Sequence, residues 1–196
     1  MRQPKLYSYV VEHDTGHAPN PYFAVCTLCR CKYRETLNKP RNVVELAEVG
    51  DWIVGTGGSN ARRSAGHGRL VYAMRIDEKL TREQYHGEAR FVKKKPSSPG
   101  TYAQQRGDNL APTNDFEELD QFALISRHFY YFGANAVRIP QRFSKLEKKG
   151  PGFRNRFDSA EINRFVAWLE KNYKQGRHGE PCQSERQESS KCKSSC

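Results

Sequence analysis

The stretch of sequence that decides the fold spans residues 50–76 and reads GDWIVGTGGSNARRSAGHGRLVYAMRI. A Gly-Asp turn opens it, and the apolar run that starts at Trp52 is typical of a buried strand. Residues 59–68 are basic and interrupted by glycine, which indicates a loop, and residues 69–76 alternate as a second strand does. Together they predict a hairpin-like unit of strand, glycine-rich loop and strand.

Further short strands are expected on both sides of this unit. Residues 5–11 are rich in β-branched and aromatic side chains, and residues 22–28 also read as extended and buried. Three short candidates follow at residues 122–126, 129–132 and 136–139. These segments predict an α+β fold in which a small, mostly antiparallel, β-barrel-like sheet is flanked by helices.

The clearest single element is an amphipathic helix near the C-terminus. Asp158 followed by Glu161 has the pattern of a capping box. Thr81 with Gln84 has the same pattern and predicts a second, shorter helix. Apolar residues recur at helical spacing after Glu161 and define the buried face of the last helix: Ile162, Phe165, Val166, Leu169 and Tyr173.

The length of 196 residues suits one domain. We expect that domain to occupy residues 1–176, with Gly176 as the stop of the last helix. Residues 177–196 are polar and have no apolar face, so they are predicted to form a disordered tail. Residues 93–114 combine lysine, proline and glycine, which indicates a long surface loop.

The chain is strongly basic, since 33 Lys and Arg against 22 Asp and Glu give a net charge of +11. Such a field concentrates polyanions, so we expect nucleic acid, DNA in the first place, or a nucleotide as the partner. A merely soluble basic protein, or one with an acidic partner, fits the charge as well. No apolar run reaches the roughly 20 residues that span a bilayer, and no signal-peptide pattern opens the chain. A cytoplasmic protein without membrane contact is therefore expected.

The glycines after the first strand of the hairpin are candidates for phosphate binding. Glycine lets backbone amides approach an anion, and several cations follow in the sequence. A plain hairpin loop is the alternative, because no Walker lysine and no evident helix follow. The predicted phosphate-binding residues are Gly55, Thr56, Gly57, Arg62, Arg63, Arg69, Lys93 and Lys94.

Catalytic candidates are scattered along the chain. His13 beside Asp14 suggests acid–base chemistry, although turn formation is the simpler interpretation. The cysteines at residues 26–31 lack the second ligand pair of a zinc site, so we expect no metal and favour buried thiols, with Cys26 as a nucleophile a minor alternative. The candidates are His13, Asp14, Cys26, Asp51 and Asp108, and the sequence indicates no particular cofactor or oligomeric state.

Several blocks together resemble the nucleotide modification associated domain family that is the second of that name. The blocks are YSYVVxxDxGxAPNP at residues 7–21, CTL at 26–28 with CK at 31–32, VGDWIVGTG at 49–57, GRLVYAMR at 68–75, GDN at 107–109, LISxxFxYFG at 124–133 and IP at 139–140, where x marks a position outside the resemblance. The resemblance runs from about residue 5 to residue 156. It implies an α+β domain that accompanies the DNA base-modification and defence systems of phages and bacteria, with no established reaction and no catalytic residues.

A fainter likeness is to the small barrels of the PUA, EVE and ASCH superfamily, which hold nucleic acid or a flipped, modified base. That likeness implies an aromatic pocket beside a phosphate-gripping rim. The base-pocket candidates are Asp14, Asn20, Trp52 and Tyr72.

Two hypotheses follow. The first is a nucleic-acid-binding module of DNA base modification that recognises a modified or flipped base. The second is an enzyme, a transferase or hydrolase, that acts on a nucleotide or modified base. A regulatory partner protein fits the charge equally well but has no motif in its favour.

Overall fold

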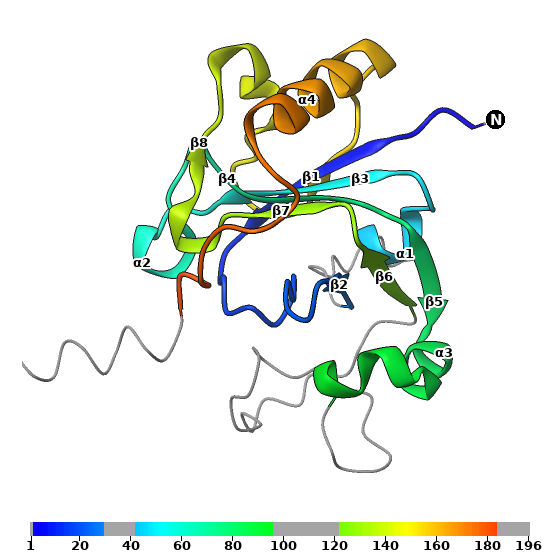
Figure 1. Ribbon diagram of the computed structural model, residues 1–196. Helices are drawn as coiled ribbons and strands as arrows, with labels where there is room; N and C mark the ends of the chain where they lie inside the picture. The colour runs from blue at the N-terminus through cyan, green and yellow to red at the C-terminus, as the bar shows by residue number, and fades with distance from the viewer. Residues whose placement is uncertain (1, 30–41, 96–121, 184–196) are drawn as a thin grey trace, which may run out of the picture.

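A computed structural model describes residues 2–29, 42–95 and 122–183 of the chain (Figure 1). The larger of two sheets has the strand order β10-β7-β4-β3-β1-β9, with β8 paired to β4. Its strands are β1 (Leu6–Val11), β3 (Trp52–Gly57), β4 (Arg69–Arg75), β7 (Phe129–Tyr131), β8 (Val137–Arg138), β9 (Phe153–Arg154) and β10 (Gly176–Arg177).

The predicted hairpin forms the middle of this sheet. β3 and β4 pair in antiparallel fashion, with Trp52 opposite Arg75 and a register shift between Gly55 and Thr56. β1 lies parallel to β3 on the other side, and β10 lies parallel to β7. The remaining pairs of the sheet are antiparallel. The prediction of a mostly antiparallel sheet is therefore confirmed.

The second sheet continues the first across a bend. It has the order β2-β6-β5, with β2 (Cys26–Leu28), β6 (Phe122–Ser126) and β5 (Glu78–Thr81) all antiparallel. Hydrogen bonds from Arg75 N to His128 O at 3.0 Å and from Asp77 N to Ile125 O at 2.8 Å carry the pairing through the bend. The described residues thus form two open sheets and no closed barrel, so the expected barrel-like sheet is replaced by two sheets joined through these hydrogen bonds.

Short helices connect and cover the strands. They are α1 (Val43–Leu46), α2 (Ala61–Ser64), α3 (Arg82–Gly87), α4 (Ser159–Asn172) and the 3₁₀ helices η1 (Ala89–Lys94), η2 (Gly133–Asn135) and η3 (Gln141–Leu146). Both predicted capping boxes are present, at Thr81 and at Asp158. α4 ends at Asn172, earlier than the expected stop at Gly176, which instead begins β10.

The core lies on both faces of the larger sheet. α4 covers one face (Figure 1) and buries Ile162, Phe165 and Leu169 there. On β4, five consecutive residues from Leu70 to Met74 are buried, so both faces of this central strand are covered. Of the five residues in the predicted stripe of α4, these three are buried, whereas Val166 and Tyr173 are partly buried and Tyr173 follows the last residue of the helix.

Residues 177–183, which the sequence assigned to a disordered tail, are part of the folded domain. Arg177 pairs with Tyr131 in the sheet, and Cys182 is buried. His178 N donates to Tyr131 O at 2.7 Å, and Ala134 N donates to Glu180 O at 2.8 Å. We call residues 176–183 the strap. Its first two residues pair with the end of β7, and backbone hydrogen bonds fix the residues that follow. The polar composition of this segment gives no sign of these bonds. Residues 184–196 lie outside the described residues.

Candidate functional site

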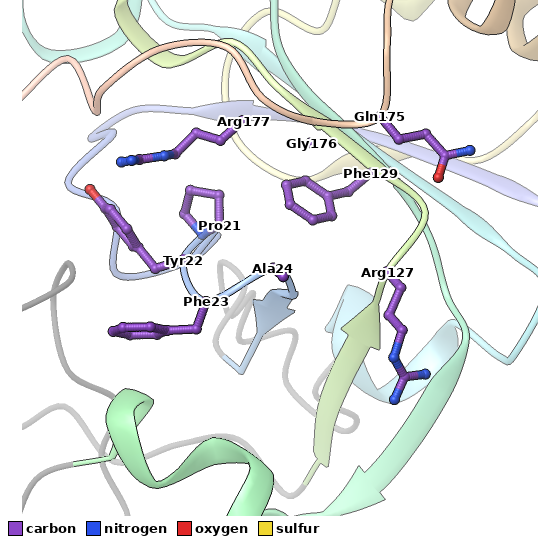
Figure 2. Close-up of a pocket in the computed structure, with 9 residues that line it drawn as sticks. All are labelled: Pro21, Tyr22, Phe23, Ala24, Arg127, Phe129, Gln175, Gly176 and Arg177. Carbon is purple, nitrogen blue, oxygen red and sulfur yellow. The ribbon is translucent and has the colours of Figure 1, made fainter.

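A cleft of about 420 Å³ lies between three segments that are distant in the sequence (Figure 2). Its walls are formed by three segments. They are a turn at residues 21–24, residues 127 and 129 around the start of β7, and residues 175–177, the last two of which begin the strap. Its lining consists of Pro21, Tyr22, Phe23, Ala24, Arg127, Phe129, Gln175, Gly176 and Arg177.

The turn has an unusual backbone. Phe23 and Ala24 have φ angles of 59° and 60°, in the left-handed region that side chains other than glycine rarely adopt. Such residues occur where the surroundings hold them, often at functional sites. Phe23 is 38% exposed, a large fraction for an aromatic ring. The expectation that residues 22–28 form one buried extended segment is therefore wrong before Cys26.

Cations and aromatic rings are paired around this turn. The guanidinium of Arg177 lies 4.7 Å from the centre of the Tyr22 ring, and the ammonium of Lys93 lies 5.6 Å from that of Phe23. Arg177 also donates to Glu180 at 3.0 Å. Figure 2 shows Arg177 beside the Tyr22 ring, with the Phe23 ring on the same side of the cleft.

Arg127 stands on the opposite side of the cleft (Figure 2). Its side chain is 57% exposed and lies 3.2 Å from a carboxylate oxygen of Glu78. Arg90 already donates two hydrogen bonds to that carboxylate, at 2.8 and 2.9 Å, and with Arg127 lowers the pKa of Glu78. Arg90 also donates to Glu88 at 3.0 Å, so Arg90 and Arg127 together balance the charges of Glu78 and Glu88, and it is the exposed part of the Arg127 side chain that an anion in the cleft meets.

The predicted glycine cradle is a strand instead. Gly55, Thr56 and Gly57 lie in β3 between β1 and β4, where the sheet ladder uses their backbone amides. A Cβ on Gly55 would lie 2.2 Å from the Tyr72 ring, so this glycine makes room for an aromatic side chain. Gly55, Thr56 and Gly57 therefore lie in a paired strand and not in the loop that both interpretations assumed.

The predicted phosphate-binding cations divide into two groups. Arg62, Arg63, Arg69 and Lys93 are exposed, on α2, at the start of β4 and in η1, and Arg69 donates to Ala136 O at 2.9 Å. They remain predicted phosphate contacts outside the cleft lining. Lys94, by contrast, is 1% exposed and its ammonium is bonded to the protein. Burial lowers its pKa to about 8. Lys94 therefore does not offer its charge to a phosphate.

The predicted base pocket is part of the core. Tyr72 is 0% exposed, and its hydroxyl lies 2.6 Å from that of Tyr9. Trp52 is 4% exposed and packs its ring against His128 at 5.1 Å. Asn20 is buried as well and bonds to Lys94. These residues cannot stack on a base while the core is closed, and the exposed aromatic ring is that of Phe23 instead, while Tyr22 is only 6% exposed.

The catalytic candidates do not share one site. Asp14 is buried, accepts hydrogen bonds from Tyr131 Oη at 2.5 Å and Cys182 N at 3.1 Å, and has its pKa raised by burial. His13 Nδ1 lies 3.1 Å from an oxygen of Gln183, so both residues hold the strap.

Asp51 and Cys26 have structural surroundings, and Asp108 lies outside the described residues. Asp51 accepts from Arg2 at 2.8 Å, Lys5 N at 2.7 Å and Glu48 N at 3.0 Å, which fixes the turn before β3. Complete burial raises the pKa of Cys26 to about 12, so its thiol is not ionised at neutral pH and is a poor nucleophile. Cys29 is likewise buried and reduced, as favoured from the sequence.

Two further observations concern metals and membranes. Within the described ranges, no group of three or more His, Cys, Asp and Glu side chains is arranged to hold a metal ion. Over the same part of the chain, no helix combines the length and the apolar character that crossing a membrane requires.

Sequence reasoning missed the residues that make the cleft. Arg177 fell in the expected tail, and Tyr22 and Phe23 in the expected buried strand. The turn formers Asn20 and Pro21 directly before these aromatic residues were the available signal, because they indicate a turn as readily as the start of a strand.

Comparison with known proteins identifies a family. The sequence model of the family described as nucleotide modification associated domain 2 matches residues 3–122 and 113–188. No curated protein and no solved structure matches the chain. The two matched segments span nearly all described residues, and the chain therefore belongs to the nucleotide modification associated domain 2 family.

Proposed function

We propose that the cleft binds nucleic acid or a nucleotide, with a base on the Phe23 ring and phosphates beside Arg127 and Arg177. The observation that carries this proposal is an exposed aromatic ring on a left-handed turn with cationic side chains around it. Membership in a family named for nucleotide modification supports the same class of ligand.

The chemistry of the lining suits such a ligand. Stacking of a base on an aromatic side chain contributes about 1–3 kcal/mol and tolerates any base, since every base has a π-face. A planar guanidinium binds phosphate oxygens with two parallel hydrogen bonds. The cleft volume of about 420 Å³ falls within the usual range for small-ligand sites, roughly 300–1,000 Å³.

The wider surface supports a polymeric ligand over a free nucleotide. The net charge of +11 raises the local concentration of any polyanion. Arg62, Arg63 and Arg69 are exposed away from the cleft lining and serve as further phosphate contacts in this proposal. A base reaches an aromatic ring in a cleft only when it is unstacked, so single-stranded DNA or a flipped, modified base in a duplex is the proposed substrate.

Binding of plain and base-modified oligonucleotides, single-stranded and duplex, tests the proposal by fluorescence anisotropy over a salt series. Phe23→Ala is expected to weaken binding about tenfold or more, because it removes stacking. The salt slope, which is the slope of the logarithm of the binding constant against the logarithm of the salt concentration, is expected to stay unchanged, because no phosphate contact is lost. Arg127→Ala combined with Arg177→Ala is expected to flatten the salt slope by about one for each phosphate that the protein no longer neutralises. Arg62→Ala with Arg63→Ala tests the predicted outer contacts in the same way.

Val92→Ala is the matched control, since Val92 is 65% exposed and does not line the cleft. Unchanged affinity in Phe23→Ala and in the Arg127/Arg177 double variant would refute the assignment of the cleft. A preference for one modified base that persists at high salt would support recognition of that base.

An enzyme acting on a nucleotide is the second candidate, and one observation favours it. The pKa of Asp14 is raised by burial, as in many general acids, and its carboxylate makes a 2.5 Å bond to Tyr131. The carboxylate also accepts from Cys182 N, so it joins the strap to β7 and has a structural role, which is why binding is the primary proposal. Conversion of a nucleotide by the wild-type protein and not by Asp14→Asn, at equal oligonucleotide affinity, would establish the enzyme instead.

A further inference from the structure

Lys94 ends η1 and directs its side chain toward the cleft turn. Its Nζ donates to Asn20 O at 2.9 Å, Asn20 Oδ1 at 2.8 Å and Val25 O at 2.7 Å. Thr27 Oγ1 lies at 3.5 Å. Lys94 is 1% exposed, and these four oxygens are all neutral. A lysine buried among neutral acceptors is costly, so its presence calls for a role.

The acceptors of Lys94 mark the two ends of the turn. Asn20 directly precedes residues 21–24, and Val25 directly follows them, so one ammonium joins both ends. Reciprocal hydrogen bonds between Asn20 and Thr27, at 2.9 and 3.0 Å, close the loop just outside this link. Hydrogen bonds from a charged donor are stronger than neutral ones. The ammonium is therefore well suited to hold the two ends of the turn together.

The backbone conformation of the turn is unfavourable by itself and needs hydrogen bonds from its surroundings. Phe23 and Ala24 both lie in the left-handed region, which costs free energy for residues with a Cβ. Without the link between Asn20 and Val25, the turn can relax to an ordinary backbone and carry the Phe23 ring away from the cleft. The neighbouring Lys93 instead lies over the exposed Phe23 ring, so two consecutive lysines act on the same turn in different ways.

We propose that Lys94 is the positioning residue of the cleft: its buried ammonium holds residues 21–24 in the left-handed conformation that presents Phe23 to a base. The effect of Lys94 on binding rests on the proposed function, whereas its effect on the turn does not. Lys94 touches no ligand itself and acts through Phe23.

A double-mutant cycle in oligonucleotide binding tests the proposal, with Lys94→Met, Phe23→Ala and both together. Lys94→Met is expected to weaken binding about tenfold, from the loss of charged hydrogen bonds, and to leave the salt slope unchanged. In the Phe23→Ala background the same substitution is expected to cost nothing further. An equal loss in both backgrounds, or a salt slope reduced by about one, would overturn the proposal.

Lys95→Met is the matched control. Lys95 is adjacent and also donates to two carbonyls, His86 O at 2.6 Å and Glu88 O at 2.8 Å, but neither belongs to the turn. It is expected to keep wild-type affinity. Ala24→Gly supplies a rescue, because glycine adopts the left-handed conformation without cost and should restore much of the affinity lost in Lys94→Met. If Lys94→Met does not fold, Lys94→Gln takes its place in the cycle.

Amide hydrogen exchange without ligand separates this inference from the proposed function. Lys94→Met is expected to speed exchange about tenfold at residues 22–25 while the core strands stay protected. If wild type binds no oligonucleotide, the proposed function fails, and faster exchange at the turn still supports the role of Lys94. Unchanged exchange at these residues would overturn that role whatever the binding result.

Discussion

Asp14→Ala tests whether the strap is part of the folded domain. The two carboxylate oxygens of Asp14 accept from Tyr131 Oη and from Cys182 N, and both donors are buried. Each donor left without a partner costs about 1–3 kcal/mol, so the two together cost about 2–6 kcal/mol. The substitution also removes a carboxylate whose pKa is raised by burial, which offsets part of this cost. We expect a net loss of about 2–4 kcal/mol in the free energy of unfolding.

Urea denaturation measures the loss, and amide hydrogen exchange locates it. Protection should fall first at His178 and Cys182, whose amides donate to Tyr131 O and to Asp14. Asp158→Asn is a suitable control because asparagine caps a helix as well as aspartate does. A variant with wild-type stability and wild-type protection in the strap would refute the reasoning. Oligonucleotide affinity should fall too, since the strap carries Arg177.

Three further predictions concern the core and the buried lysine. Phe165→Ala should lower the free energy of unfolding by about 3–5 kcal/mol in urea denaturation, because a fully buried ring leaves a cavity. Gly55→Ala should cost about 1–3 kcal/mol or more in the same assay, because the new Cβ meets the Tyr72 ring at 2.2 Å, and Tyr72→Phe would not relieve it. Lys94 has a folded-state pKa of about 8 against 10.5 for the free side chain, so the unfolded state binds more protons between these values. The free energy of unfolding of the wild type should therefore rise by about 3 kcal/mol between pH 8 and pH 10.5, relative to that of Lys94→Met. An equal pH dependence in both proteins would contradict the lowered pKa.

The sequence alone predicted the features that depend on neighbours in the chain. The strand that begins at Trp52, the strand at residues 69–75 and the capping boxes at Thr81 and Asp158 are set by side chains within a few positions of one another, although the sequence did not predict that the first strand continues to Gly57. Hydrophobic periodicity likewise predicted the buried face of α4, and the motifs predicted the family. A cap or an amphipathic stripe needs no knowledge of the rest of the fold, because its partners are local.

The site was decided by the tertiary structure. The sequence suggested that Gly55 binds phosphate and that Tyr72 lines a base pocket. Both residues are buried, because they lie on paired strands in the middle of the sheet. Lys94 looked like part of an exposed lysine run, yet its ammonium is the buried link of a turn that begins after Asn20, 74 positions away in the chain.

The cleft arises because the fold of the two joined sheets brings together residues 21–24, 127–129 and 175–177. No pattern within one segment specifies that meeting. Composition and periodicity determine which side chains are exposed to water and which are buried in the core. Strand pairing determines which of the exposed side chains share a surface. For this protein the sequence therefore determined the elements, the charge and the family, and only the packing of distant segments determined where an exposed ring and cationic side chains lie together.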